Sequence, residues 1–145
     1  MRRLGPMTPA QAALISLLWL PGAQAADLTV DVIGLKNSRG DVHIALFDDP
    51  ANFPYEEGVR VSEEVAIKGL RASAVFHDLQ PGKYAIAVYH DENGNRQFDQ
   101  GFLGIPLEEF GFSSGARAFL GPPSFEDADI ILPDDGTTTV IDLGN

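Results

Sequence analysis

Apolar and polar residues alternate along most of the chain from residue 27 onward. Leu28, Val30 and Val32 are separated by Asp and Thr residues, for example. A period of two is typical of strands with one buried face, and helical spacing never persists beyond about one turn. We therefore expect about seven strands and no helix longer than a turn. The predicted strands cover residues 28–32, 42–46, 59–61, 65–67, 74–79, 83–90, 128–132 and 137–143.

Turn signals between these segments indicate how the strands connect. The sequence Asn-Ser-Arg-Gly at 37–40 separates the first two strands, so we expect a β-hairpin there. The segments 59–61 and 65–67 are expected to form a second, short pair. The strand 83–90 is apolar on both faces, which favours a central position in a sheet.

The turn before the strand 83–90 carries a more specific pattern. A hydrophobic residue, a Pro-Gly turn and Tyr84 just inside the next strand resemble the tyrosine corner of Greek-key sandwiches. We expect the Tyr84 hydroxyl to bond a nearby backbone group while the ring packs in the core. Together with the strand spacing, this pattern predicts an all-β fold, a single antiparallel β-sandwich of about seven strands with one long loop rich in glycine and phenylalanine.

That long loop lies between residues 90 and 125, where the alternation stops for about 35 residues. Glycines permit tight reversals and phenylalanines can pin a loop onto the sandwich, so we expect an ordered cap. Two interpretations of the six phenylalanines are open. They are either satellite core or a ligand-stacking surface, for which Phe102, Phe112 and the neighbouring Glu108 are the candidate ligand-binding residues.

The first part of the loop carries the most specific chemistry. Asp91, Asn93, Asn95 and Asp99 fall at relative positions 1, 3, 5 and 9. A tightly curled loop with this spacing can aim several side-chain oxygens and the Gln97 carbonyl at one point. Calcium prefers six to eight hard oxygen ligands of this kind. The four side chains are therefore candidate calcium ligands.

The match to a helix-flanked calcium loop is incomplete. Arg96 stands where the sharp-turn glycine would be, and Phe102 stands where a bidentate glutamate is expected. The missing carboxylate would have to come from Glu92, Glu108 or Glu109. The alternative is a metal-free turn rich in Asn, Asp and Gly and held by side-chain to backbone hydrogen bonds.

The first 25 residues have the features of a cleaved export signal. Two arginines at positions 2 and 3 precede an apolar run over 12–20, and Ala23-Gln24-Ala25 matches a small-x-small cleavage site. We expect the mature domain to cover residues 26–145, in the periplasm or outside the cell, with no membrane span after cleavage. Free calcium is typically plentiful there.

Charge and cysteine content narrow the function classes. The chain has 21 acidic and 10 basic residues and a net charge of −11, and removal of the two signal arginines makes it −13. This balance opposes binding to nucleic acid and to anionic lipid surfaces. The lack of cysteine excludes disulfides, thiolate metal sites and a cysteine nucleophile. We expect an extracytoplasmic protein, a small molecule or a glycan as the partner.

Enzyme chemistry has little support in the sequence. The three histidines lie on different predicted strands without metal-ligand spacing, and no serine lies in a nucleophile-elbow motif. His90, at the end of the central strand, is expected to bond Asp91 or Glu108 and so orient the loop. A small hydrolase would have to use Glu108, Asp99 and His90, with two of the carboxylates acting on a sugar bond.

The motifs of the second half together resemble a known family. They comprise Tyr89-His90-Asp91-Glu92-Asn93-Gly94-Asn95, Asp99, Leu103-Gly104-Ile105-Pro106, Glu108, Phe110-Gly111-Phe112-Ser113 and Gly121-Pro122-Pro123-Ser124-Phe125. This pattern is similar to that of DUF2141, an uncharacterised family of exported bacterial proteins. The resemblance covers essentially the whole chain after the signal. It implies an exported β-sandwich similar to transthyretin-like modules and implies no established activity.

Three functions follow as hypotheses. The first is an exported, non-catalytic binding or envelope-accessory module that uses the 91–125 segment, with a calcium-ordered loop at 91–99. The second is a purely structural envelope domain in which the loop only caps the sandwich. The third is a small transthyretin-like hydrolase that uses the loop carboxylates and His90.

Overall fold

The computed structural model describes residue 22 and residues 24–144. Most of the predicted export signal, residues 1–25, lies outside the described residues. No helix in the described part of the chain is long and apolar enough to cross a membrane.

The described chain is built mainly of strands. Its eight strands are β1 Ala26–Ile33, β2 Asp41–Phe47, β3 Val59–Ala66, β4 Ala72–Leu79, β5 Gly82–Asp91, β6 Phe110–Phe112, β7 Ile130–Leu132 and β8 Thr137–Asp142. Short helical turns join them at η1 Pro50–Asn52, η2 Glu56–Gly58, η3 Phe102–Gly104, η4 Ser113–Gly115 and α1 Phe125–Ala128. The longest of these turns has four residues. The predicted all-β class is therefore confirmed.

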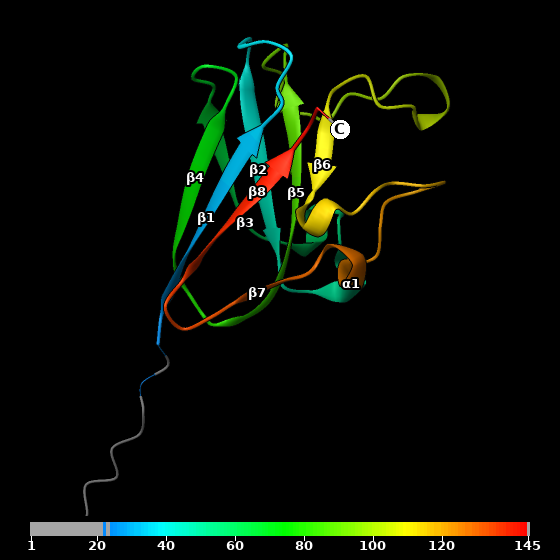
Figure 1. Ribbon diagram of the computed structural model, residues 1–145. Coiled ribbons are helices and arrows are strands. Elements are labelled where there is room, and N and C mark those ends of the chain that lie inside the picture. Colours follow the sequence, from blue (N-terminus) through cyan, green and yellow to red (C-terminus); the bar gives the residue numbers. More distant parts are fainter. Residues whose placement is uncertain (1–21, 23, 145) are drawn as a thin grey trace, which may run out of the picture.

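The strands form two sheets packed face to face (Figure 1). One sheet has the order β4-β1-β8, and the other has the order β3-β2-β5-β6, with β7 pairing the opposite end of β5. The pairings are antiparallel except that β1 and β8 run parallel. This one parallel pair departs from the purely antiparallel sandwich that the alternation predicted.

The main core lies between the two sheets. Alternate residues of β1 point inward from one sheet, and alternate residues of β2 and β5 face them from the other sheet, where both sets are buried. The side chains at its centre are Leu28, Val30, Val32, Val42, Ile44, Leu46, Ile86 and Val88. Burial of this inner face is why the period of two is so regular in these strands.

Two expectations about strand pairing were wrong. β1 and β2 do not form a hairpin, because β1 pairs with β4 and β8 while β2 pairs with β3 and β5. The connection over 34–40 crosses from one sheet to the other and buries Leu35 in the core. The segment 59–67 is not a pair either, because β3 is one continuous edge strand whose exposed Glu63 and Glu64 interrupt the apolar pattern.

The central strand and the tyrosine corner were predicted correctly. β5 lies between β2 on one side and β6 and β7 on the other. The hydroxyl of Tyr84 donates a hydrogen bond to the carbonyl oxygen of Gln80 at 2.7 Å, and the ring is buried. The Pro-Gly turn therefore anchors the start of β5.

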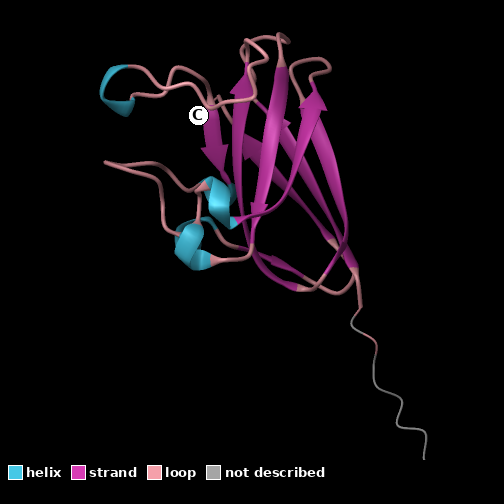
Figure 2. Ribbon diagram, turned by 180° about the vertical axis from the view of Figure 1, so that it is seen from behind, coloured by secondary structure: helices cyan, strands magenta, loops and turns pink. Residues whose placement is uncertain are grey.

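A second apolar cluster covers the outer face of the larger sheet. Phe112 and Phe125, both from the long loop, pack there with Phe53 and Phe47. Ring centroids 5.0 to 5.9 Å apart in edge-to-face arrangements join these four side chains through Phe53. In Figure 2 the loop and its short helices lie against this side of the sheet. The loop is thus an ordered cap. It contains the strand β6, whose three residues are too few to show an alternating pattern in the sequence.

Candidate functional site

The 91–99 loop begins at the last residue of β5. The Asp91 side chain is 1% exposed, and its Oδ1 accepts hydrogen bonds from the backbone N–H groups of Gly94 at 2.7 Å and Asn95 at 3.2 Å. Its Oδ2 accepts the backbone N–H of Arg96 at 2.7 Å. One buried carboxylate therefore curls three successive backbone groups around itself, and both Gly94 and Arg96 take positive φ angles in this bend.

The same contacts determine the charge of Asp91. Burial by itself raises the pKa of a carboxyl group, but the three backbone N–H donors and the nearby His43 outweigh it and hold the pKa of Asp91 below its usual value. The His43 Nε2 atom lies 3.5 Å from Asp91 Oδ2. Asp91 is consequently an ionised group in the folded protein at neutral pH.

The next three predicted ligands gather on one side of the bend. Asn93 Oδ1 accepts the N–H of Asn95, and Asn95 Oδ1 accepts the N–H of Gln97, both at 2.9 Å. The side-chain amide of Asn93 donates to Asp99 Oδ2 at 2.5 Å. The amide of Asn95 donates to both Asp99 oxygens, at 2.9 Å to Oδ1 and 3.1 Å to Oδ2. The side chains at 93, 95 and 99 therefore lie together, but Asn93 and Asn95 turn their amide N–H groups toward Asp99 and keep their oxygens on the backbone. The hydrogen bonds of the metal-free alternative hold the turn.

Glu108 is the glutamate that reaches this loop. Its Oε2 accepts the backbone N–H of Asp99 at 3.0 Å, and its side chain is 8% exposed. The position follows from a narrow hairpin in which the N–H of Leu107 bonds the carbonyl oxygen of Asp99 at 2.9 Å and Gln100 pairs with Pro106. The other oxygen, Oε1, is buried and has no hydrogen-bond partner among the described residues.

The ring of Tyr89 reports the electrostatic character of this region. Burial, followed by the charges of Asp91, Glu108, Glu64 and Asp99, raises the pKa of Tyr89 to about 12. Anionic groups on several sides disfavour a further negative charge on the phenol. Four acidic side chains of this region therefore act on the Tyr89 phenol in addition to its burial.

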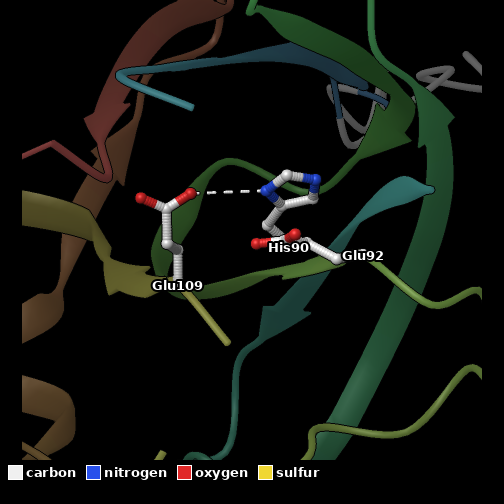
Figure 3. A group of neighbouring side chains, drawn as sticks. All are labelled: His90, Glu92 and Glu109. Atoms are coloured by element: carbon white, nitrogen blue, oxygen red, sulfur yellow. Dashed lines mark hydrogen bonds and ion pairs between the residues drawn. The ribbon is translucent and has the colours of Figure 1, made fainter. Parts of the chain in front are cut away.

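His90 lies on the opposite face of β5 and makes different contacts from those we expected. The ring is fully buried, with Nδ1 3.3 Å from Glu109 Oε2 and Nε2 2.7 Å from the carbonyl oxygen of Arg39 (Figure 3). The predicted partners, Asp91 and Glu108, are replaced by Glu109. The reason is strand parity, because Asp91 points to the outer face of the sheet and His90 to the inner one.

Two glutamates flank His90, and each is paired with a cation of the chain. Glu92 accepts hydrogen bonds from Asn37 and Arg39, and these lower its pKa despite partial burial. Glu109 forms an ion pair with Lys36 at 3.3 Å. His90, Glu92 and Glu109 place potential ligand atoms within 4.8 Å of one another. Because both carboxylates already have cationic partners, this cluster serves to clamp the 34–40 connection onto the end of β5.

The two predicted ligand-binding phenylalanines lie in different environments. Phe112 is 9% exposed and packs edge-to-face on Phe53 and Phe110. Phe102 is 85% exposed and projects from the hairpin that begins at Asp99. The structure therefore gives Phe112 a packing role, and only Phe102 is open to a partner. Of the six loop phenylalanines, Phe102 and Phe119 are the exposed ones.

The comparison with known families bears directly on this region. A family model described as "Uncharacterized protein conserved in bacteria (DUF2141)" matches residues 30–141. The chain belongs to the DUF2141 family. The matched residues include the whole 91–99 loop, Glu108 and both sheets, so the resemblance found in the motifs is confirmed. No curated protein and no solved structure matches the chain.

One neighbour of the loop in this DUF2141 member was not anticipated from its sequence. His43 stacks on Tyr89 with ring centroids 4.7 Å apart and also lies 3.8 Å from Glu64. The pairing of β2 with β5 sets His43 opposite Tyr89, which lies two residues before Asp91 in β5. The period of two tells which residues share a face with His43, but only the pairing register reveals what that face contacts.

Proposed function

We propose that the protein is an exported, non-catalytic binding module that uses the 91–125 segment as its working surface. We further propose that Ca²⁺ orders this segment, held by the 91–99 loop together with Glu108. The export part of the proposal is supported by the basic, apolar and small-residue pattern of positions 1–25.

One observation carries the calcium proposal. Glu108 is a buried carboxylate with one oxygen fixed on the N–H of Asp99 and the other oxygen without a partner among the described residues. A buried charge is costly unless it is paired or coordinates a metal. Glu108 thus supplies the carboxylate that the loop sequence lacks at its twelfth position.

The remaining oxygens suit the same ion. Asp99 adds a second carboxylate, which accepts the side-chain N–H groups of Asn93 and Asn95, so Ca²⁺ binding would have to turn the oxygens of these two amides toward the ion. Asp91 Oδ2 accepts one backbone N–H and lies 3.5 Å from His43 Nε2. The carbonyl of Gln97 follows in the same turn. A set of carboxylate, amide and carbonyl oxygens without nitrogen or sulfur favours calcium over transition metals.

Thermal unfolding of the purified protein tests the proposal. Ca²⁺ that binds the folded state alone raises its stability by about 2.7 kcal/mol at a hundredfold excess over Kd. For a domain of this size that corresponds to a rise of about 10 °C in Tm. We expect this rise in 1 mM Ca²⁺ relative to chelator, and a smaller one in 1 mM Mg²⁺, which tolerates this flexible, many-oxygen geometry poorly.

Glu108→Gln isolates the proposed ligand. The amide oxygen of Gln can still accept the N–H of Asp99, so stability in chelator should change little, whereas most of the Ca²⁺ response should be lost. Glu57→Gln, which removes a charge at an exposed position, is the matched control. A wild-type Tm that does not move in millimolar Ca²⁺ refutes calcium binding, and an undiminished response in Glu108→Gln refutes the role of Glu108.

The geometry does not favour the hydrolase. His90 is fully buried with both ring nitrogens engaged by Glu109 and Arg39. A general acid or base has to lie within hydrogen-bond reach of substrate, directly or through a water. The Glu108 carboxylate accepts the backbone N–H of Asp99, and the Asp99 carboxylate accepts the side-chain amides of Asn93 and Asn95, so both carboxylates serve the loop.

A further inference from the structure

Two apolar loop tips project from the 91–125 segment. The first tip covers residues 100–107 and the second covers 116–123. Phe102, Leu103, Phe119 and Leu120 are between 83% and 97% exposed. Bulky apolar side chains exposed to this degree in two neighbouring loops indicate an interaction site.

The two tips are built alike. Phe102-Leu103-Gly104 and Phe119-Leu120-Gly121 are the same tripeptide, and each is followed by a proline two residues later. In both tips the leucine takes a left-handed backbone conformation, with φ of 60° at Leu103 and 54° at Leu120. Non-glycine residues adopt this region at an energetic cost, which is commonest at functional sites.

Both tips extend in the same direction. Figures 1 and 2 show two loops reaching away from the sheets on one side of the molecule. Residues of both tips, Gly104 and Leu107 from the first and Leu120 and Pro122 from the second, line one broad open groove. A backbone hydrogen bond closes the first tip, from the N–H of Gly101 to the carbonyl oxygen of Ile105 at 2.7 Å.

Acidic side chains are absent from the tips although the chain is strongly acidic. The 21 acidic residues include none in 100–107 or 116–123, and the only charged side chain in either tip is Arg117. The interior of a bilayer excludes charged groups and can accept apolar side chains from separate loops. Aromatic side chains are favoured at its boundary. A protein partner would instead need one continuous, closely packed and complementary surface. Two loop tips that project on either side of a groove do not form such a surface.

We propose that the two tips insert into the outer part of a lipid bilayer and dock the protein on a membrane surface. Phe102, Leu103, Phe119 and Leu120 enter the boundary between headgroups and acyl chains, about 5–10 Å deep. The acidic body stays in water. The inference rests on the proposed role of the 91–125 segment as a binding surface, and it does not depend on calcium.

Tryptophan placed in the tips tests insertion directly. The single Trp of the chain, Trp19, lies in the predicted export signal, so in protein that starts at residue 26 the variants Phe102→Trp and Phe119→Trp each carry one tryptophan. In chelator with zwitterionic phosphatidylcholine vesicles, we expect a blue shift of emission at both tips and quenching by lipids brominated high in the acyl chain. Val75→Trp, at a partly exposed position of β4 in the other sheet, should show neither effect.

Loss of binding is measured by vesicle co-sedimentation. Phe102→Ser and Phe119→Ser should each weaken partitioning at least about tenfold, because each removes a fully insertable aromatic side chain. Leu70→Ser, also at an exposed apolar position, should leave it unchanged. Unaltered Tm of the tip variants in buffer distinguishes lost docking from unfolding.

Three results would overturn the proposal. The first is wild-type protein that does not sediment with phosphatidylcholine vesicles. The second is binding only to anionic vesicles, since that would reflect charge and not apolar insertion. The third is a wild-type dimer in sedimentation velocity that Phe102→Ser or Phe119→Ser converts to a monomer, because the occupant of the tips would then be a second copy of the chain. The chelator separates these results from a failure of calcium binding.

Discussion

The Asp91 carboxylate is the best single point at which to test how the loop is built. Its two oxygens hold the backbone N–H groups of Gly94, Asn95 and Arg96. In Asp91→Asn one oxygen is replaced by an NH₂ group of almost the same size. The amide can still serve Gly94 and Asn95 through its oxygen, but it presents an N–H to the N–H of Arg96.

The magnitude follows from these contacts. A hydrogen bond to a charged group contributes about 1.5–3 kcal/mol, and a neutral one about 1 kcal/mol. Asp91→Asn loses one bond and weakens two others. The freed N–H belongs to Arg96, an exposed residue, and can be rehydrated, and removing a buried charge offsets part of the loss. We therefore expect a destabilisation of about 2 to 3 kcal/mol, or roughly 10 °C in Tm.

Urea unfolding in chelator, with calcium absent from both states, measures this difference. Asp134→Asn makes the same chemical change in an exposed turn and should alter stability by less than about 0.5 kcal/mol. If Asp91→Asn costs no more than this control, the carboxylate does not organise the loop and the reasoning is refuted.

The same variant predicts a pH dependence. The pKa of Asp91 is lowered in the folded state, so its contribution is fully present above the unfolded value of about 3.9. The contribution is lost as the pH falls from that value through the folded pKa. The stability difference between wild type and Asp91→Asn should thus shrink as the pH falls below about 4. A difference that grows on acidification would contradict an ionised Asp91.

Two further predictions concern the packing behind the loop. Ser113→Ala should lower the free energy of unfolding in urea by about 2–3 kcal/mol. The reason is that the fully buried Ser113 hydroxyl accepts the N–H of Ile86 and donates to the carbonyl oxygen of Ala128. A loss below about 1 kcal/mol would mean that these groups find other partners. Gly111→Ala should cost about 1–2 kcal/mol, because the added Cβ would lie 2.8 Å from Leu143 Cδ2, and an unchanged midpoint would show that Leu143 moves aside freely.

The strands were largely predictable, but their pairing was not. β5 was recognised as central because both of its faces are apolar, and Tyr84 was recognised from its Pro-Gly turn. The false hairpin of β1 and β2 arose because a period of two specifies which face is buried and leaves open which strand lies beside it. A seven-residue connection that buries Leu35 allows β2 to join the other sheet.

The candidate site shows the same division. The converging positions of Asn93, Asn95 and Asp99 follow from local spacing, because all lie within one turn of the chain. Local spacing does not tell which glutamate reaches the loop, Glu108 or one of Glu92 and Glu109. The choice depends on a hairpin that folds the chain back nine residues later, and on the clamp that occupies the other two glutamates.

By itself the sequence determined most of the strand positions, the tyrosine corner, the long ordered loop and membership of the DUF2141 family, because period, turn chemistry and motif spacing are local properties of the chain. Only the tertiary structure decided which sheet each strand joins, which glutamate faces the loop, and why Phe112 is buried while Phe102 is exposed. Those outcomes depend on which distant segments pack together. Burial sets the free-energy cost or gain of each polar or apolar group, and a group is buried only once these segments have packed.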